Sequence, residues 1–269
     1  MIIEQPIMLK IEKIVEEAKD IRTFIFKHQL DSKPGQFVNV WIPGADEKPF
    51  SVSYQDDGRF GITVFSVGTF SKKLNSMKAG EKVGIRGPYG NGFTLKRGHV
   101  ALVGGGCGTA PLAFLANELK KAGSKVEFIT GARSIDYVLF VERMQKAGIS
   151  TQIATDDGSC GIKGFATDLL QDILKKNPGI SMVYTCGPEI MMKKVVDLCD
   201  MHRKSCEVSM ERHMKCGFGV CGQCCVDNTG IRVCKEGPVF SNDSIKGIFE
   251  FNKYKRDSSG KKVPFNVCK

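Results

Sequence analysis

Five of the eleven cysteines in this 269-residue chain lie close together, between Cys216 and Cys234. Four of them follow the spacing C-x4-C-x2-C-x9-C, and these are Cys216, Cys221, Cys224 and Cys234. A C-x4-C-x2-C…C spacing is typical of a [2Fe–2S] cluster held by four thiolates. We therefore predict that these four cysteines bind iron, with Cys234 arriving from a separate strand or turn. Cys225 is expected to be a bystander, because the x2 interval selects Cys224.

Glycines within the cysteine run favour a loop that folds around a cluster. Gly217, Gly219 and Gly222 permit positive φ angles and a close approach, so that backbone N–H groups can point at the sulfurs. The alternatives are a structural zinc site, a disulfide framework and buried, inert cysteines. Zinc prefers C-x2-C pairs on both sides, and one such pair is present. Disulfides are rare in a chain without a signal peptide, and inert cysteines need no clustering. The spacing favours the iron–sulfur site over all three.

A glycine-rich segment, Gly104–Pro111, joins an expected strand to an expected helix. Glycines there let the chain approach a phosphate, and a helix start stabilises its negative charge. The loop lacks the full G-x-G-x-x-G pattern, so alone it leaves a nucleotide site and an ordinary turn equally open. Thr155–Gly158 and Cys186–Glu189 also follow expected strands, and would lie at the carboxyl edge of a sheet, where α/β folds bind ligands. The alternative for Cys186 is a small buried apolar side chain.

A third group of residues suits a flavin. Lys48, Pro49, Phe50 and Ser51 sit at a strand start, and Gly68-Thr69-Phe70-Ser71 precedes a short helix expected over 72–77. A cation and a hydroxyl beside an aromatic ring suit a flavin with its pyrophosphate, and the helix start suits the phosphate. The residues by themselves favour the alternative, an ordinary strand start and helix cap.

The first region that must position these residues is 1–97, which we expect to be an antiparallel β-barrel for FAD. Its short β-branched and aromatic runs, separated by turns, are typical of such a barrel. The expected strands are Ile21–Phe26, Phe37–Ile42, Phe50–Tyr54 and Phe60–Val67. The expected turns are Pro34-Gly35, Pro43-Gly44, Asp57-Gly58 and Gly87-Pro88.

Residues 98–209 form the second expected domain, and residues 210–269 the third. Strands and helices alternate in the second at βαβ lengths, which predicts a parallel sheet with helices on both faces. The expected strands are Val100–Val103, Val126–Ile129, Ser150–Ala154 and Ser181–Thr185; the expected helices are Ala110–Ala122, Tyr137–Ala147, Phe165–Lys176 and Pro188–His202. The third holds the cysteine run and a basic tail from Ser241 that either wraps over the body or remains loose.

Composition limits the function classes. The formal net charge is +10, but Lys and Arg are scattered in pairs, which favours solvated faces over a nucleic-acid patch. A basic, zinc-containing nucleic-acid-binding module stays a minor alternative, disfavoured also by the single Trp41. No targeting segment is visible, and the most apolar stretch, Val100–Leu115, is too short and too interrupted by glycine and proline to span a membrane. We expect a cytoplasmic protein with no membrane or nucleic-acid partner.

In their order along the chain, these motifs resemble the ferredoxin-reductase superfamily. Within it, the chain is most similar to the electron-transfer subunits of NAD-dependent, class B dihydroorotate dehydrogenases. The likeness covers nearly the whole chain and is most specific in the cysteine run with its Gly-Pro-Val-Phe tail. It rests on Lys48–Ser51, Gly68-Thr69, Gly104–Pro111, Cys186–Pro188, and Met214–Cys216 through Cys234–Phe240.

The resemblance implies FAD in the barrel, NAD(H) on the parallel domain and a [2Fe–2S] cluster in the C-terminal segment. The implied flavin contacts are Lys48, Pro49, Phe50, Ser51, Thr63, Val64, Phe65, Gly68 and Thr69. The implied nicotinamide-nucleotide contacts are Gly105, Gly106, Gly108, Thr109, Ala110, Cys186, Gly187 and Pro188. One departure is Lys48, where the family usually has arginine; lysine keeps the charge but loses the planar fork, so we expect weaker FAD binding.

The resemblance also implies a function in pyrimidine biosynthesis. A partner subunit carrying FMN oxidises dihydroorotate, electrons pass singly through the cluster to FAD, and FAD gives hydride to NAD⁺. No acid–base residue of this chain is required, and the assembly is expected to be a heterotetramer. The alternative is a diaphorase subunit of a hydrogenase or sulfur reductase with the same cofactors. NAD and NADP stay unseparated, because Arg133 suits either a 2′-phosphate or solvent.

Overall fold

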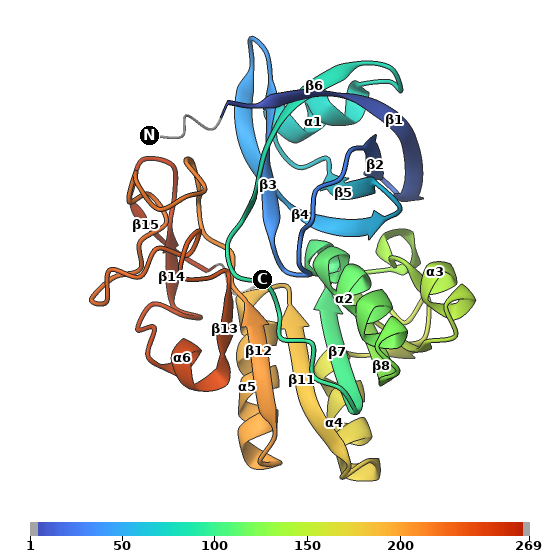
Figure 1. Ribbon diagram of the computed structural model, residues 1–269. Coiled ribbons are helices and arrows are strands. Elements are labelled where there is room, and N and C mark those ends of the chain that lie inside the picture. Colours follow the sequence, from blue (N-terminus) through green and yellow to red (C-terminus); the bar gives the residue numbers. More distant parts are fainter. Residues whose placement is uncertain (1–4, 266–269) are drawn as a thin grey trace.

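The N-terminal region is a closed antiparallel barrel in a computed structural model that describes residues 5–265 (Figure 1). Its strands are β1 (Ile7–Ala18), β2 (Ile21–Lys27), β3 (Phe37–Ile42), β4 (Asp46–Asp56), β5 (Arg59–Phe65) and β6 (Lys82–Tyr89), closed in the order β1-β2-β5-β4-β3-β6. This confirms the predicted barrel. The expected ends at 1–4 and 266–269 lie outside the described residues.

Two local predictions for the barrel were wrong. Gly87 and Pro88 do not form a turn but lie inside β6, where Pro88 needs no ladder N–H. The helix expected over 72–77 is α1 (Thr69–Ser76) and begins earlier, because the Ser71 hydroxyl accepts the backbone N–H of Gly68 at 2.9 Å and fixes the helix start there. The expected turns at Pro34-Gly35, Pro43-Gly44 and Asp57-Gly58 are present.

The second region is a seven-stranded sheet with the order β10-β9-β8-β7-β11-β12-β13. Its strands are β7 (His99–Gly105), β8 (Lys125–Ala132), β9 (Ser150–Thr155), β10 (Ile162–Lys163), β11 (Ile180–Cys186), β12 (Ser205–Ser209) and β13 (Val239–Ser241). Every neighbouring pair is parallel except β12 with β13, which is antiparallel. The predicted parallel sheet is confirmed, with one antiparallel edge strand contributed by the C-terminal segment.

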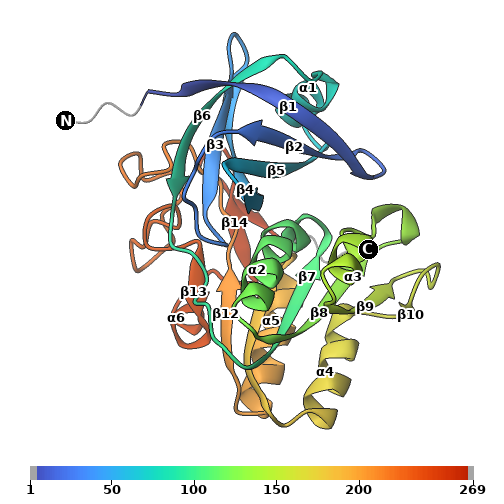
Figure 2. The same cartoon turned by 45° about the vertical axis from the view of Figure 1, so that its right-hand side comes forward.

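Helices cover both faces of this sheet, as predicted (Figure 2). Leu102 of β7 packs in the cluster with α2 (Thr109–Lys121) and α3 (Val141–Lys146), whereas its neighbour Val103 packs with α4 (Ala166–Lys176) and α5 (Glu189–Met201). This alternation follows from the period of two along a strand.

The continuous helix expected over Tyr137–Ala147 is wrong. A 3-10 turn at Ile135–Tyr137 is separated from α3 by extended backbone at Val138 and by Phe140 at φ 62°. Phe140 is 5% exposed, so burial of its ring accompanies the left-handed backbone that ends helical continuity.

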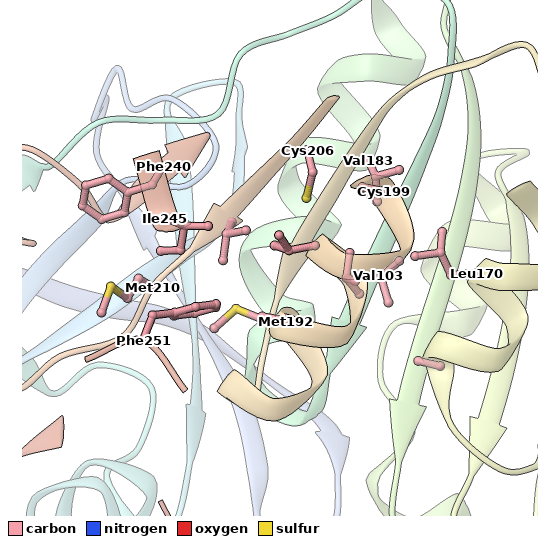
Figure 3. Close-up of a cluster of buried hydrophobic side chains, with 14 of the residues drawn as sticks. Val103, Leu170, Val183, Met192, Cys199, Cys206, Met210, Phe240, Ile245 and Phe251 are labelled. Carbon is pink, nitrogen blue, oxygen red and sulfur yellow. The ribbon is translucent and has the colours of Figure 1, made fainter. Parts of the chain in front are cut away.

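The tail, which the sequence left undecided, packs on the body. It contains α6 (Asn242–Lys246) and the hairpin β14 (Tyr254–Arg256) with β15 (Lys262–Pro264). Phe251 and Ile245 of the tail are buried in the same cluster as Met192 of α5 and Met210 (Figure 3). Within residues 5–265, no helix is long and apolar enough to cross a membrane.

A buried triad of charged side chains joins the sheet, the cysteine segment and the tail. The Arg212 guanidinium pairs with Glu189 at the start of α5, and with Glu250 of the tail at 2.6 Å. Their side chains are only 3%, 4% and 1% exposed, respectively. The second oxygen of Glu250 accepts the backbone N–H of Asp227 at 2.9 Å. The triad therefore ties the sheet, the cysteine segment and the tail together.

Candidate functional site

The four predicted iron ligands lie in one loop and one turn. Cys216 is half-buried and Cys221 exposed, whereas Cys224 and Cys234 are buried, and Cys234 lies in a turn as expected. Backbone N–H groups donate to their sulfurs, among them Val220 to Cys216 Sγ and Cys234 to Cys224 Sγ, each at 3.4 Å. The loop and the turn together therefore provide two buried thiols, Cys224 and Cys234, and two more exposed thiols, Cys216 and Cys221.

The predicted glycine conformations in this loop are confirmed. Gly217, Gly219 and Gly222 have φ of 88°, 84° and 69°. A Cβ at Gly217 would lie 2.7 Å from the Tyr89 ring of β6 and 3.2 Å from Asn39 Nδ2 of β3. The loop therefore presses against the barrel at a position that admits glycine alone.

The electrostatics at Cys216 suit a metal-bound thiolate. Burial raises the pKa of this thiol, but backbone N–H groups of Cys221, Val220 and Phe218 outweigh burial and lower the pKa to about 6. Among residues 5–265, no three His, Cys, Asp or Glu side chains converge on one metal ion. A [2Fe–2S] cluster divides four thiolates between two irons, so the backbone donors and the glycine conformations fit that group.

The predicted flavin residues lie on two neighbouring barrel strands and the helix beside them. Lys48, Pro49, Phe50 and Ser51 belong to β4, and Thr63, Val64 and Phe65 belong to β5. The Phe50 ring stacks on Phe70 of α1 with centroids 6.1 Å apart. Val64 is fully buried in the barrel core, backbone included, so the structure leaves it no exposed atom for a flavin contact. Lys48 pairs with Asp46 in the structure.

The start of α1 fits a phosphate. Gly68 and Thr69 are exposed, and the first turn contains no acidic residue. A Cβ at Gly68 would meet no atom within 4 Å, so the space in front of the helix start is open. Backbone N–H groups at such a start attract anions.

At the carboxyl edge of the sheet, two of the three predicted nucleotide loops touch each other. β7, β9 and β11 all end there, at Gly105, Thr155 and Cys186. A Cβ at Gly108 would overlap the backbone of Cys186 and Gly187, so the first and third loops are in backbone contact. At Gly106, where φ is 53°, a Cβ would meet no atom within 4 Å, so that side of the loop is open to a ligand.

Not all predicted nucleotide contacts can use their side chains. Thr109 is 0%, Ala110 4% and Cys186 3% exposed. Gly106 and Pro188 are accessible at the same edge. These three residues are buried as a whole, backbone included, so they can contact a nucleotide only if the edge opens.

The glycine contact yields a prediction. Gly108→Ala is expected to destabilise the protein by about 1–3 kcal/mol, because the new methyl group overlaps the Cys186 backbone. It is also expected to raise the KM for NADH, because the two loops must separate. Urea unfolding and NADH-dependent dye reduction measure both effects. Gly179→Ala is the control, because a methyl group there meets nothing within 4 Å. Equal effects of the two substitutions would contradict the loop contact.

Sequence reasoning missed two features, one beside the nucleotide loops and one beside the cysteine loop. Cys107 Sγ lies 4.0 Å from Glu211 Oε1, so a thiol after β7 meets a carboxyl after β12. Desolvation by the surrounding protein, followed by the negative charge of Glu211, raises the pKa of Cys107 to about 12. Desolvation also raises the pKa of Glu211. Both residues are nevertheless partly exposed at the surface. Asn39 is the other, a polar residue within the apolar strand Phe37–Ile42. That interruption was the only local signal.

Three family models match the chain in succession. Residues 8–93 match an oxidoreductase FAD-binding domain, and residues 102–197 an oxidoreductase NAD-binding domain. Residues 211–246 match the iron–sulfur cluster binding domain of dihydroorotate dehydrogenase B. The three matches fall on the barrel, the parallel sheet and the cysteine segment.

Curated relatives are similar over nearly their whole length. A protein of Methanocaldococcus jannaschii, described as a probable dihydroorotate dehydrogenase B (NAD(+)), electron transfer subunit, is 46% identical over 97% of this chain and 99% of its own. A protein of Methanothermobacter thermautotrophicus with the same description is 45% identical over 97% of this chain and 98% of its own.

Solved structures share the fold. The NADH-dependent reduced ferredoxin-NADP oxidoreductase matches with a TM-score of 0.78 and 30% identity, over 90% of this chain and 92% of that one. Phthalate dioxygenase reductase matches with a TM-score of 0.60 and 20% identity, over 72% of this chain and 66% of that one, a likeness of fold alone.

Proposed function

The chain belongs to the family of dihydroorotate dehydrogenase B electron transfer subunits. On this basis we propose that it carries electrons to NAD⁺ from a catalytic subunit, and that this catalytic subunit oxidises dihydroorotate. It is an oxidoreductase subunit with FAD-binding, NAD-binding and iron–sulfur-cluster-binding domains. We propose domain limits of 1–97, 98–209 and 210–269, a catalytic partner that contains FMN, and assembly of the two subunits as a heterotetramer.

The observation that carries this proposal is the packing of the cysteine loop directly on the FAD barrel. Asn39 of β3 donates to the carbonyl oxygens of Lys215 and Cys216, and β3 pairs with β4, the strand of Lys48–Ser51. A chain that only bound NAD(H) and flavin would not need a four-thiolate loop packed on its flavin-binding barrel.

We propose the following division of labour among the residues. Cys216, Cys221, Cys224 and Cys234 hold the cluster; β4, β5 and the start of α1 hold FAD; and the loops after β7 and β11 hold NAD(H). The cofactors, when bound, supply the exchange between one-electron and two-electron carriers. The protein binds and orients them, and the N–H groups aimed at the sulfurs stabilise negative charge on the thiolates.

The test is anaerobic purification of the full chain, followed by assay of iron, zinc and flavin on one sample. About two irons and one flavin per chain are expected, with flavin bands and a broad visible shoulder. NADH should bleach the flavin, and dihydroorotate should do so only when the catalytic subunit is added. A colourless protein with stoichiometric zinc would refute the proposal. Efficient oxidation of dihydroorotate by this chain alone would refute the division between subunits.

Lys48 provides a prediction for FAD affinity. Lys48→Met is expected to weaken FAD binding by about 1.5–3 kcal/mol, the loss of a charge-assisted bond to phosphate. Lys48→Arg is expected to strengthen it, because a guanidinium offers a planar fork. Titration of the apoprotein with FAD measures both, and Lys13→Met on β1 is the control for lost charge. If Lys48→Met bound FAD as tightly as the unsubstituted chain, Lys48 would not be a phosphate ligand.

A further inference from the structure

Asn39 is a fully buried polar residue on the outward face of the barrel. Its neighbours Val38 and Val40 are 0% exposed and belong to the barrel core, so the alternation along β3 turns Asn39 outward. Asn39 is nevertheless 0% exposed. The start of the cysteine loop covers it, at Lys215 and Cys216.

The side-chain amide of Asn39 donates both of its hydrogens, but its oxygen accepts no hydrogen bond. Nδ2 donates to the carbonyl oxygen of Lys215 at 3.0 Å and to that of Cys216 at 3.2 Å. These use both of its hydrogens, and the opposite amide orientation would bring Oδ1 against two acceptors. Oδ1 is buried and has no partner within the described chain, which is unfavourable because the oxygen has lost its hydrogen bonds to water. An apolar side chain of the same shape would avoid that cost, so packing does not explain the asparagine.

The same contact continues into the loop. Gly217 follows Cys216 and lies where a Cβ would be 3.2 Å from Asn39 Nδ2. Beyond it, the Val220 N–H donates to Cys216 Sγ. The position of the Cys216 carbonyl therefore sets the path of the backbone that turns back toward the sulfur of the same residue.

On its other side, Asn39 adjoins the strand proposed for the flavin. It is directly opposite Pro49 in the β3–β4 ladder, and Val40 is opposite Lys48. Residues opposite each other in an antiparallel pair share one face of the sheet. Asn39 thus stands between the cysteine loop and the segment Lys48–Ser51.

We propose that Asn39 is a positioning residue, which fixes the first ligand of the iron–sulfur cluster against β3, beside the strand proposed for the flavin, and thereby sets the reduction potential of the cluster. The inference rests on the proposed function, because it requires a cluster in this loop. Without the two bonds, the start of the loop is free to move away from β3, and the N–H donors around Cys216 Sγ weaken. Those donors favour the more negatively charged reduced cluster, so the potential should fall when they weaken.

The experiment uses the full chain, purified anaerobically with FAD, and compares Asn39→Leu with Asn75→Leu. Leucine keeps the branching and the number of side-chain heavy atoms and removes the donors. Asn75 is a matched control in the barrel region: it is 8% exposed, its Nδ2 donates to Asp20 O at 3.1 Å, and its Oδ1 also has no partner among the described residues. The measurements are the EPR spectrum of the reduced cluster, its midpoint potential by redox titration, and the rate of flavin reduction by NADH.

We expect Asn39→Leu to change the EPR spectrum and lower the midpoint potential, while NADH reduces the flavin at the unsubstituted rate. Asn75→Leu should leave the EPR spectrum and the potential unchanged. Loss of the cluster in Asn39→Leu, with flavin kept and the cluster intact in Asn75→Leu, would also support the proposal. Asn39→Asp should change the EPR spectrum and the midpoint potential at least as much as Asn39→Leu, since it places a carboxylate acceptor against two carbonyl oxygens.

An unchanged spectrum and potential in Asn39→Leu would overturn the inference, because a packing residue gives that result. Equal loss of flavin and cluster in both leucine variants would also overturn it, as a general effect of disturbing the barrel. Failure of the proposed function would be seen separately, as the absence of iron from the unsubstituted chain.

Discussion

Cys224→Ser is expected to abolish the iron–sulfur cluster while leaving the flavin bound. Cys224 is 3% exposed, its sulfur accepts the N–H of Cys234, and a serine oxygen does not replace a thiolate on iron. Removing an outer-shell partner of a metal site already costs roughly 10–100-fold in affinity, and loss of a ligand should cost more. NADH-dependent dye reduction should persist, whereas NAD⁺ reduction driven by the catalytic subunit should disappear.

The adjacent Cys225 offers a matched control for this prediction. Cys225→Ser makes the same chemical change one residue away and is expected to retain about two irons per chain. Iron assay, EPR and the two activities separate the variants. If Cys225→Ser lost the cluster and Cys224→Ser kept it, the x2 interval would have selected the wrong cysteine, and the ligand set would have to include Cys225.

Arg212→Met is expected to destabilise the protein by about 3–5 kcal/mol, because it leaves Glu189 and Glu250 buried without their cation. Methionine has a similar length, so the effect reports the charge more than the packing. Urea unfolding at neutral pH measures it. The control is Arg59→Met, whose partner Glu12 lies on the barrel surface. It should leave the free energy of unfolding in urea nearly unchanged.

The Arg212 effect should depend on pH. Burial raises the pKa of Glu189 above its ordinary value even with Arg212 beside it, and removing the cation should raise it further. A carboxyl with a raised folded-state pKa adds stability below its unfolded pKa and loses it as pH rises through the folded pKa. Arg212→Met should therefore be less destabilised near pH 5 than near pH 8. Equal losses at both values would mean that Glu189 is not the source of the effect.

Loss of the triad should also affect the site. Glu189 follows Pro188 of the predicted nicotinamide loop, and Arg212 lies close before the cluster loop. We therefore expect the Arg212→Met variant to bind NAD(H) and the iron–sulfur cluster less tightly at temperatures where it is still folded. This contact was not anticipated from sequence, since an isolated Arg or Glu in a charged chain is ordinarily a surface residue.

Local patterns were enough to predict the cysteine segment, whereas the flavin and nucleotide contacts were implied by the family resemblance. The cysteine spacing and the three intervening glycines are short-range features, and a loop that needs positive φ angles records that need in its own residues. The parallel sheet was predictable for the same reason, because strand and helix periods are written into each segment. The ligand roles of the cysteines and the contacts to FAD and NAD stay predictions.

Tertiary structure decided what lies between those segments. Asn39 and Lys215 are 176 residues apart, Cys186 meets Gly108 across two loops, and Phe251 of the tail packs near Met192. The prediction of a continuous helix over Tyr137–Ala147 was wrong because Phe140 is buried in a left-handed conformation. The residues next to it in the sequence give no sign of that conformation. Sequence alone determined the cysteine segment and the strand and helix periods of the sheet, since each depends on residues within one short run of the chain. The mutual placement of the segments depends on side chains far apart in the chain that fill or bond one another, and no local period records such a pairing.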